Sequence, residues 1–240
     1  MLDKKSPIPI YIQIEEQLKQ RIAQGDFLMG TAIPSERELT ERFGVSRMTV
    51  RQSITNLVND GLLYREKGRG TFVASPKVEQ PLNGLTSFAE DMLKRGMVPS
   101  SKLIGFEVLE PESDIAADLQ LAEGDKVYFV ERIRFADDKP MAIERTYLPV
   151  EHFPNLDQES FQASLYAMIE EGQQLAVSRA TQRMEAGLVK KEDADLLQIK
   201  APAAILMIER ISYRAGEQPF EVVRSTYRAD RYKFTTDIKR

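Results

Sequence analysis

The apolar residues of the first third of the chain recur with helical spacing and then give way to short strand-like runs. A helix is predicted over residues 10–23, and its apolar stripe consists of Tyr11, Ile14, Leu18 and Ile22. A second helix begins after Ser35, which is spaced as a capping box with Glu38, and Gly44 stops it. Ser46 caps a third helix, in which one stripe is buried and the first turn is left free: Val50, Ile54, Leu57 and Val58.

Two short apolar runs follow the third helix, at Leu62–Tyr64 and Thr71–Val73. The six residues between them, 65–70, are basic and contain two glycines, which predicts a β-hairpin with a basic tip. Helix, tight turn, helix and basic hairpin is the order of a winged helix-turn-helix.

The polar residues that this pattern leaves exposed suit double-stranded DNA. An α-helix fits the major groove, where an arginine can bond guanine O6 and N7 together, and Arg47 and Arg51 lie one turn apart at the start of the third helix. Hydroxyls and helix N-terminal amides suit phosphate oxygens, and glycine lets the backbone approach a groove. The DNA-binding residues expected are Arg37, Ser46, Arg47, Thr49, Arg51, Lys67, Gly68 and Arg69.

Residues 75–83 contain two prolines and have no periodicity, which predicts a semi-stiff linker. We therefore expect a DNA-binding domain over 1–74 and a second domain over 84–240. The second domain opens with a helix predicted over 87–95, with Thr86 or Ser87 as its cap.

The second domain contains an internal repeat. Residues 114–135 align without gaps with residues 192–213, at an offset of 78, and each copy predicts a short helix, a turn and a long strand. Second strands at 142–148 and 221–227 close two similar hairpins. Two copies of one unit predict a sheet around a pseudo-two-fold axis, with a pocket where the copies meet. Between the copies, the pattern predicts a helix over 160–171 and a strand over 177–185.

The net charge of −4 is unevenly distributed. Residues 1–76 hold 11 Lys and Arg against 9 Asp and Glu, whereas residues 77–240 hold 22 against 28. The field at the groove matters more than the total, and residues 46–75 hold 5 basic side chains against 2 acidic ones. The acidic total is therefore compatible with DNA binding by the first domain.

Cysteine is absent and His152 is the single histidine, which excludes disulfides, thiolate metal sites and a histidine metal cluster. We expect no metal and no cofactor, and read His152 as an ordinary loop residue. The longest apolar run, residues 203–208, is far shorter than the roughly 20 residues of a membrane span, and the N-terminus lacks a signal-peptide core. We therefore expect a cytoplasmic protein without a membrane partner.

Arg132 and Arg134 are two residues apart in a predicted strand, so their side chains leave the same face. Spacing alone leaves two interpretations open, a solvated face and an anion-binding pair.

Several motifs resemble those of the GntR family of bacterial transcription regulators. In the first domain they are Pro34–Arg37, Phe43–Arg47, Thr49–Arg51, Leu57–Leu63 and Gly68–Val73. In the second domain the motifs resemble the effector domain (UTRA) of the HutC subfamily: Gly84–Phe88, Glu131–Arg134, Pro140–Glu144 and Tyr227–Tyr232. Within that subfamily the chain is most similar to regulators of N-acetylglucosamine utilisation.

The resemblance implies an α+β chain, with a mixed, mainly antiparallel and chorismate-lyase-like effector domain after the winged helix. It implies that the anion of a phosphorylated sugar is held by Arg132, Arg134, the helix start at Ser87, Phe88 and Ala89, and the pair Ser164 and Tyr166. Ala89 can offer only its amide. The positions linked to sugar hydroxyl and amino groups are Glu144, Arg179, Glu221 and Tyr227.

The expected function is a homodimeric repressor that binds a palindromic DNA operator and is released by N-acetylglucosamine 6-phosphate or glucosamine 6-phosphate. Related regulators answer to other sugar phosphates, urocanate or fatty acids, so a different effector stays open. An enzyme tethered to DNA is a second class, disfavoured because no motif pairs a nucleophile with a base. A ligand-free architectural DNA binder is a third.

Overall fold

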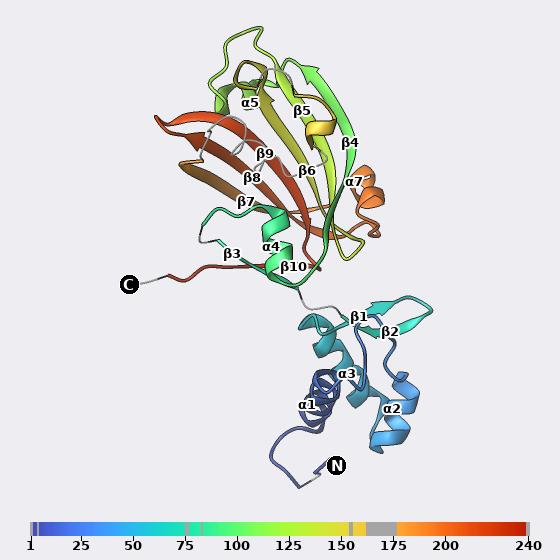
Figure 1. Cartoon of the computed structure of the whole chain (residues 1–240). Helices are drawn as coiled ribbons and strands as arrows, with labels where there is room; N and C mark the ends of the chain where they lie inside the picture. Colours follow the sequence, from blue (N-terminus) through green and yellow to red (C-terminus); the bar gives the residue numbers. More distant parts are fainter. Residues whose placement is uncertain are drawn as a thin grey trace. The chain divides into compact units, whose positions relative to one another are not determined.

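The computed structural model describes residues 2–3, 5–74, 77–82, 84–153, 156–161 and 177–238. The chain folds into two compact units, which span residues 1–77 and 78–240 (Figure 1). The first unit covers the range expected for the DNA-binding domain, residues 1–74, and extends it by three residues.

The first unit is a winged helix-turn-helix, as predicted. Its elements are α1 (Ile10–Ala23), α2 (Glu36–Phe43), α3 (Arg47–Asn59), β1 (Leu63–Glu66) and β2 (Gly70–Val73), and the two strands pair antiparallel. The capping box of α2 is confirmed, because the Ser35 hydroxyl accepts from the Glu38 amide and the Glu38 carboxylate accepts from the Ser35 amide at 2.8 Å. Gly44 ends α2 in the left-handed conformation, with φ at 61°.

One hydrophobic core holds the three helices and the wing together. Every apolar position of the predicted α3 stripe is at least partly buried, and the hairpin contributes Leu63 and Val73. Burial of each such side chain stabilises the folded unit by about 1.5–3 kcal/mol. The fully buried members of the helices are Ile14, Leu18, Leu39, Val50, Ile54 and Leu57.

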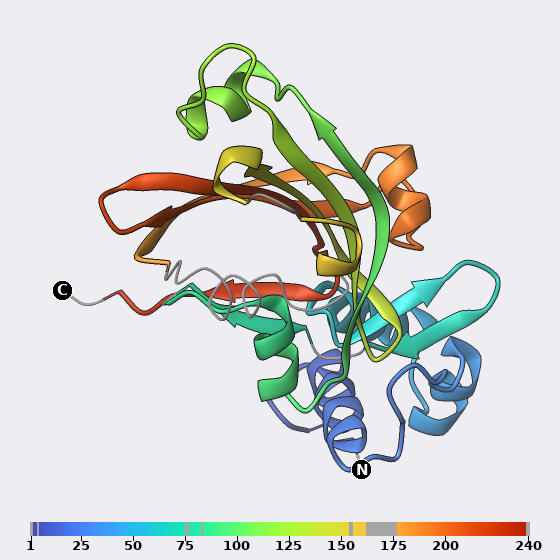
Figure 2. The same cartoon turned by 45° about the horizontal axis from the view of Figure 1, so that its top comes forward.

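The second unit is built on one antiparallel sheet of six strands in the order β4-β5-β6-β9-β8-β7. Figure 2 shows that this sheet curls strongly. The strands are β4 (Pro99–Leu109), β5 (Val127–Ala136), β6 (Lys139–Pro149), β7 (Arg179–Leu188), β8 (Ala204–Arg214) and β9 (Gln218–Arg228). The smaller elements are the helices α4 (Phe88–Lys94), α5 (Ser113–Asp118) and α7 (Lys191–Leu196), and the 3-10 turns η1 (Val150–His152) and η2 (Glu159–Phe161).

The predicted repeat is confirmed and extends further along the chain than predicted. Each copy consists of a strand, a short helix and a hairpin: β4-α5-β5-β6 and β7-α7-β8-β9. From either edge of the sheet, the first, second and third strands of one copy follow in the same order. The pseudo-two-fold axis passes between β6 and β9, where Arg145 pairs in register with Arg224. Even the turns agree, because Gln120 and Gln198, 78 residues apart, have φ values of 56° and 54°.

The prediction of an irregular linker over 75–83 is corrected for part of its length. Residues 78–81 form β3 (Val78–Pro81), which pairs in parallel with β10 (Tyr232–Thr235), the last strand of the chain. Val78 is buried, and its amide donates to the carbonyl of Arg231 at 2.6 Å. The strand forms because it has a partner more than 150 residues away, which local sequence does not reveal.

The helix predicted over 160–171 lies outside the described residues from position 162 onward, and residues 159–161 form η2.

Candidate nucleic-acid interface and ligand cavity

The first turn of α3 presents the predicted reading side chains to solvent. Arg47 is exposed, and the side chain of Arg51 is 63% exposed, while the Ser46 hydroxyl caps the helix by accepting from the Thr49 amide at 3.2 Å. Arg37 is exposed on α2. Met48, which sequence reasoning missed, is 70% exposed in the same turn, and an exposed apolar group there suits a thymine methyl.

A carboxylate links the recognition helix to the wing. Glu36 Oε1 lies 3.8 Å from Arg51 Nε and 3.4 Å from Arg65 Nη2, and Arg65 Nη2 also donates to Thr55 Oγ1 at 3.1 Å. These contacts restrain the Arg51 guanidinium from its Nε side. Glu36 and Arg65 were not predicted, since they meet only when α2, α3 and β1 are assembled.

The wing tip carries the remaining predicted cations. Gly68 has φ at 79°, a conformation that favours glycine, and Lys67 and Arg69 on either side of it are exposed. Arg69 forms an ion pair with Glu66, and its guanidinium lies over the Phe72 ring at 5.6 Å. The wing can therefore present two cations and a bare backbone to a groove.

The second unit contains a cavity of about 430 Å³. Its wall includes residues from β3, the loop to α4, α4 itself, the five strands β5 to β9, and β10. Figure 2 shows α4 and the β3–β10 pair beside the curled sheet. Both copies of the repeat contribute to the wall, as the pseudo-symmetry predicted.

Two buried arginines and a carboxylate form a charged cluster in the wall of this cavity. Arg132 and Arg134 leave the same face of β5 and are only 5% and 7% exposed. Glu144 pairs in register with Arg132, and its Oε2 lies 3.2 Å from Arg132 Nη2 and 3.6 Å from Arg134 Nη1. Burial alone would raise the pKa of Glu144, but the charges of Arg134, Arg132 and Arg210 hold it below its usual range. The guanidinium of Arg134 also lies 4.8 Å from the Phe88 ring centroid.

A second buried polar group comes from the other copy. Arg210 and Glu221 line the cavity, and Glu221 Oε2 accepts from Ser212 Oγ at 2.7 Å. Arg210 was not predicted, although the 78-residue offset makes it the counterpart of Arg132. The described wall contains three arginines and three carboxylates, those of Glu144, Glu221 and Asp91. The carboxylate of Asp91 is also paired with Arg95, which is not among the described wall residues. Because one of the carboxylates is paired outside the wall, positive charge is in excess among these groups, and the described wall can take up an anion.

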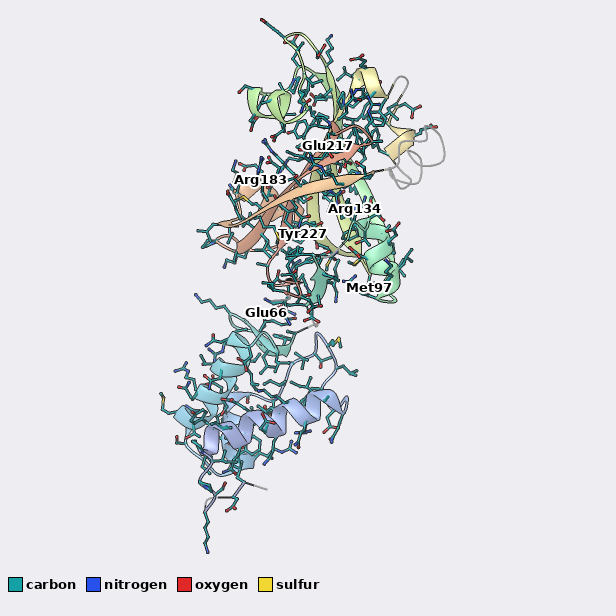
Figure 3. All side chains as sticks on the ribbon, turned by 90° about the vertical axis from the view of Figure 1, so that its left-hand side faces the viewer. Glu66, Met97, Arg134, Arg183, Glu217 and Tyr227 are labelled. Atoms are coloured by element: carbon teal, nitrogen blue, oxygen red, sulfur yellow. The ribbon has the colours of Figure 1, made fainter. Side chains whose placement is uncertain are left out.

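Aromatic residues of β9 and β10 form another part of the wall. Tyr227 and Tyr232 meet edge to face with centroids 4.7 Å apart, and Tyr232 stacks on Phe234 at 5.9 Å. Burial, together with the Glu144 carboxylate, raises the pKa of Tyr227 to about 12. Figure 3 labels Tyr227 and Arg134, which come from β9 and β5 and line this same cavity.

The start of α4 contributes less than the resemblance implied. Ser87 and Phe88 line the cavity, but Ser87 Oγ already accepts from the Glu90 amide, and the Glu90 carboxylate accepts from the Ser87 amide. This capping box leaves the first-turn amides of Phe88 and Ala89 without an intrahelical carbonyl. Ala89 itself is not among the described residues that line the cavity.

Arg179, an expected effector-binding residue, is not among the described residues that line the cavity. Its side chain is 45% exposed, forms an ion pair with Glu217, and lies over the Tyr213 ring at 3.8 Å. The neighbouring Ala180 and Gln182 line the cavity, so alternation along β7 directs Arg179 to the other face. Ser164 and Tyr166 lie outside the described residues.

Within the part of the chain that is described, no helix combines the length and apolar character needed to cross a bilayer.

Comparison with known proteins agrees with both units. Residues 10–73 match the family described as bacterial regulatory proteins, gntR family, and residues 94–233 match the UTRA domain. The transcriptional repressor NagR of Bacillus subtilis is 47% identical over 97% of this chain and 96% of its own length. The mannosyl-D-glycerate transport/metabolism system repressor MngR of Escherichia coli is 34% identical over 97% of both chains.

Solved structures agree with the fold. PhnF from Mycobacterium smegmatis superposes with a TM-score of 0.68 at 33% identity, covering 94% of this chain and 99% of its own. The winged helix, the UTRA match and the full-length relatives together show that this chain belongs to the GntR family of bacterial transcription regulators.

Proposed function

We propose that this protein is a homodimeric repressor that leaves a palindromic operator when a phosphorylated aminosugar binds the cavity of its second unit. The observation that carries the proposal is the pair of buried arginines, Arg132 and Arg134, in the wall of a cavity that belongs to the same chain as a winged helix. Arginine suits the planar, bidentate recognition of phosphate.

The DNA-binding half of the proposal rests on the exposed first turn of α3. Arg47 and Arg51 are exposed there and would read base edges, while Ser46, Thr49 and the wing would contact phosphates. A dimer presents two such helices to half-sites about one helical turn apart, and arginine readers favour G·C pairs in each half-site.

The effector half rests on the size and polarity of the cavity. A volume of about 430 Å³ suits a molecule of the size of a sugar phosphate. The arginines, carboxylates and tyrosines of the described wall match a ligand with an anion, hydroxyl groups and an amino group. The relative NagR is named a repressor, and the relative MngR is named for a sugar-derived compound, which supports a carbohydrate effector.

Glu144 lies where it neutralises both arginines. An entering phosphate competes with this carboxylate, and Glu144 can then accept from a hydroxyl or amino group of the same ligand. The cavity is thus suited to a ligand that carries both groups, such as glucosamine 6-phosphate or N-acetylglucosamine 6-phosphate.

The test is operator release. Fluorescence anisotropy on the palindromic DNA upstream of the neighbouring operon should show tight binding, lost on addition of glucosamine 6-phosphate or N-acetylglucosamine 6-phosphate. The unphosphorylated sugars, fructose 6-phosphate, urocanate and a fatty acid serve as competing effectors. Binding to no duplex at modest salt, or release by a fatty acid alone, would contradict the proposal.

A variant separates the two halves. Replacing Arg132 and Arg134 together should leave operator binding intact and abolish release, because the anion loses its partners. Arg183→Gln is the matched control, since Arg183 lies on β7 outside the described wall and pairs with Glu209. Circular dichroism checks that the double variant folds, and Arg134→Lys, which keeps the charge, provides a milder test.

A further inference from the structure

Two hydroxyl groups in the wall of the cavity are buried without a hydrogen-bond partner among the described residues. They are Thr146 Oγ1 on β6 and the phenol oxygen of Tyr232 on β10. The residues are 1% and 3% exposed, so bulk solvent reaches neither side chain to any extent. Tyr232 ends the motif Tyr227–Tyr232 but was given no role there, and Thr146 lies outside every motif.

Such groups call for an explanation, because the large majority of buried polar atoms in folded proteins are hydrogen-bonded. A buried hydroxyl left unpaired destabilises the folded chain, whereas phenylalanine or valine of the same shape would avoid that cost. Placing both hydroxyls in the wall of one cavity is therefore costly unless something in the cavity pairs with them.

The surroundings fix the Tyr232 ring and leave its hydroxyl available. The ring contacts Tyr227 and Phe234, and it belongs to the apolar cluster around Phe88 and Met92. Burial, together with the nearby Tyr227 and Glu144, raises the pKa of Tyr232, so the phenol stays protonated at neutral pH. It can therefore donate one hydrogen bond and accept others.

Thr146 is held just as firmly. It lies two residues after Glu144 on β6, so the two side chains leave the same face of the sheet. A β-branched side chain in a strand has restricted χ1 freedom, and Thr146 lines the cavity with its Oγ1 buried and unpaired among the described residues.

We propose that the hydroxyls of Tyr232 and Thr146 are effector-binding groups, which pair with hydroxyl or carbonyl oxygens on the sugar part of the ligand. This inference rests on the function proposed above and extends it from the anion to the rest of the molecule. Both groups donate and accept, so they select a hydroxyl-rich phosphate ester over inorganic phosphate or an alkyl carboxylate.

The position of Tyr232 also relates the ligand to the first strand of the second unit. Tyr232 pairs in register with Val78, the residue with which β3 and the second unit begin. A ligand that forms a hydrogen bond with Tyr232 therefore contacts the strand that is paired with β3, and β3 directly follows the DNA-binding unit along the chain.

The experiment compares Tyr232→Phe and Thr146→Val with the parent protein, using calorimetry with glucosamine 6-phosphate and N-acetylglucosamine 6-phosphate. Each variant should bind the better of the two ligands about tenfold more weakly, the loss expected for one hydrogen bond. Inorganic phosphate, which engages the arginines alone, should bind all three proteins equally. The melting temperature of the ligand-free variants should stay level or rise, because an unpaired buried hydroxyl has been removed.

Matched controls come from buried side chains outside the described cavity wall. Tyr128→Phe removes a tyrosine hydroxyl from β5, and Thr226→Val removes a threonine hydroxyl from β9 between two wall residues. Neither should change the affinity for the sugar phosphates.

Four outcomes are distinguishable. If the parent protein binds neither sugar phosphate, the proposed function fails and this inference fails with it. If the parent binds and both variants bind within twofold, only the inference is overturned. A marked drop in the ligand-free melting temperature would also overturn it, since the hydroxyls would then have partners within the protein. Weakened binding with an unchanged or raised melting temperature supports it.

Discussion

Individual side chains are placed so that charges are held in defined pairs. Glu36 lies between Arg51 and Arg65 at the exposed surface of the first unit, and Glu144 lies between Arg132 and Arg134 inside the second. The exposed group is screened by water and salt and serves orientation, whereas the buried group interacts strongly. The same residue types therefore have different energetic weight in the two units.

Arg51→Ala should weaken operator binding by about 1–3 kcal/mol, because a bidentate contact with guanine is lost. The affinity for scrambled DNA should change much less, since non-specific affinity comes from phosphate contacts. Anisotropy titrations on both duplexes measure the difference, with Lys67→Ala as the control that should weaken both equally. An equal loss on both duplexes for Arg51→Ala would contradict a base-reading role.

Glu144→Gln should destabilise the second unit by about 3 kcal/mol at neutral pH, because two buried arginines lose their carboxylate. The folded-state pKa of Glu144 is lowered, so its stabilisation is present above the ordinary carboxyl pKa and is lost as the pH falls through the folded value. Urea unfolding from pH 7 to pH 3 should show the difference between parent and variant shrinking towards acid. A difference that stays constant would refute this assignment, and the exposed Glu107→Gln serves as the control.

At the scale of elements, the two copies of the repeat exchange contacts across the pseudo-two-fold axis. Arg145 of the first copy reaches Asp193 of the second, and Arg224 of the second copy reaches Asp114 of the first, both at 2.6 Å. Each arginine also bonds a glutamate of its own copy, Glu131 or Glu209. These four contacts tie α7 and α5 to the sheet.

The two arginines occupy equivalent positions but should not contribute equally. The Asp193 side chain is 10% exposed, whereas that of Asp114 is 56% exposed. Arg145→Leu should therefore cost about 1.5–3 kcal/mol by leaving a buried carboxylate unpaired, and Arg224→Leu about 1 kcal/mol or less. Urea denaturation measures the free energy of unfolding of both variants. A larger loss for Arg224→Leu than for Arg145→Leu would show that burial of the carboxylate does not decide the size of the loss.

For the molecule as a whole, the feature that matters is where the second unit begins. Its first strand, β3, pairs with its last, β10, and both strands contribute to the cavity through Gln80 and Tyr232. The Gln80 amide also donates to Asp91 on α4. The residues that follow the DNA-binding unit are thus part of the cavity wall.

Hydrogen exchange should report this arrangement. Glucosamine 6-phosphate at about a hundred times its Kd adds about 2.7 kcal/mol of stability to whatever it binds. Amides of residues 78–81 and 232–235 should therefore exchange more slowly, while those of α2 stay unchanged. Protection confined to β5 and β6 would show that the ligand does not engage the β3–β10 pair.

The winged helix and the repeat could be predicted from the sequence because both depend on local information. The capping box at Ser35 and Glu38, the stripe of α3 and the turn at Gly44 involve residues a few positions apart, and periodicity reveals them directly. The hairpins of the second unit followed from the 78-residue offset of their first strands and, after a shift of one residue, from the similarity of their second strands. The same offset could have revealed Arg210 as the counterpart of Arg132.

The remaining features depended on contacts between distant residues. The strands β3 and β10 form because each pairs with the other, which local sequence does not reveal. The strand β4 was not predicted either. Alternation alone cannot assign a strand residue to a face, since a shift of one residue reverses every side chain, so only the tertiary structure shows that Arg179 lies outside the described cavity wall. The position of Glu144 between two arginines and the unpaired hydroxyls of Thr146 and Tyr232 arise only when several strands close around one cavity.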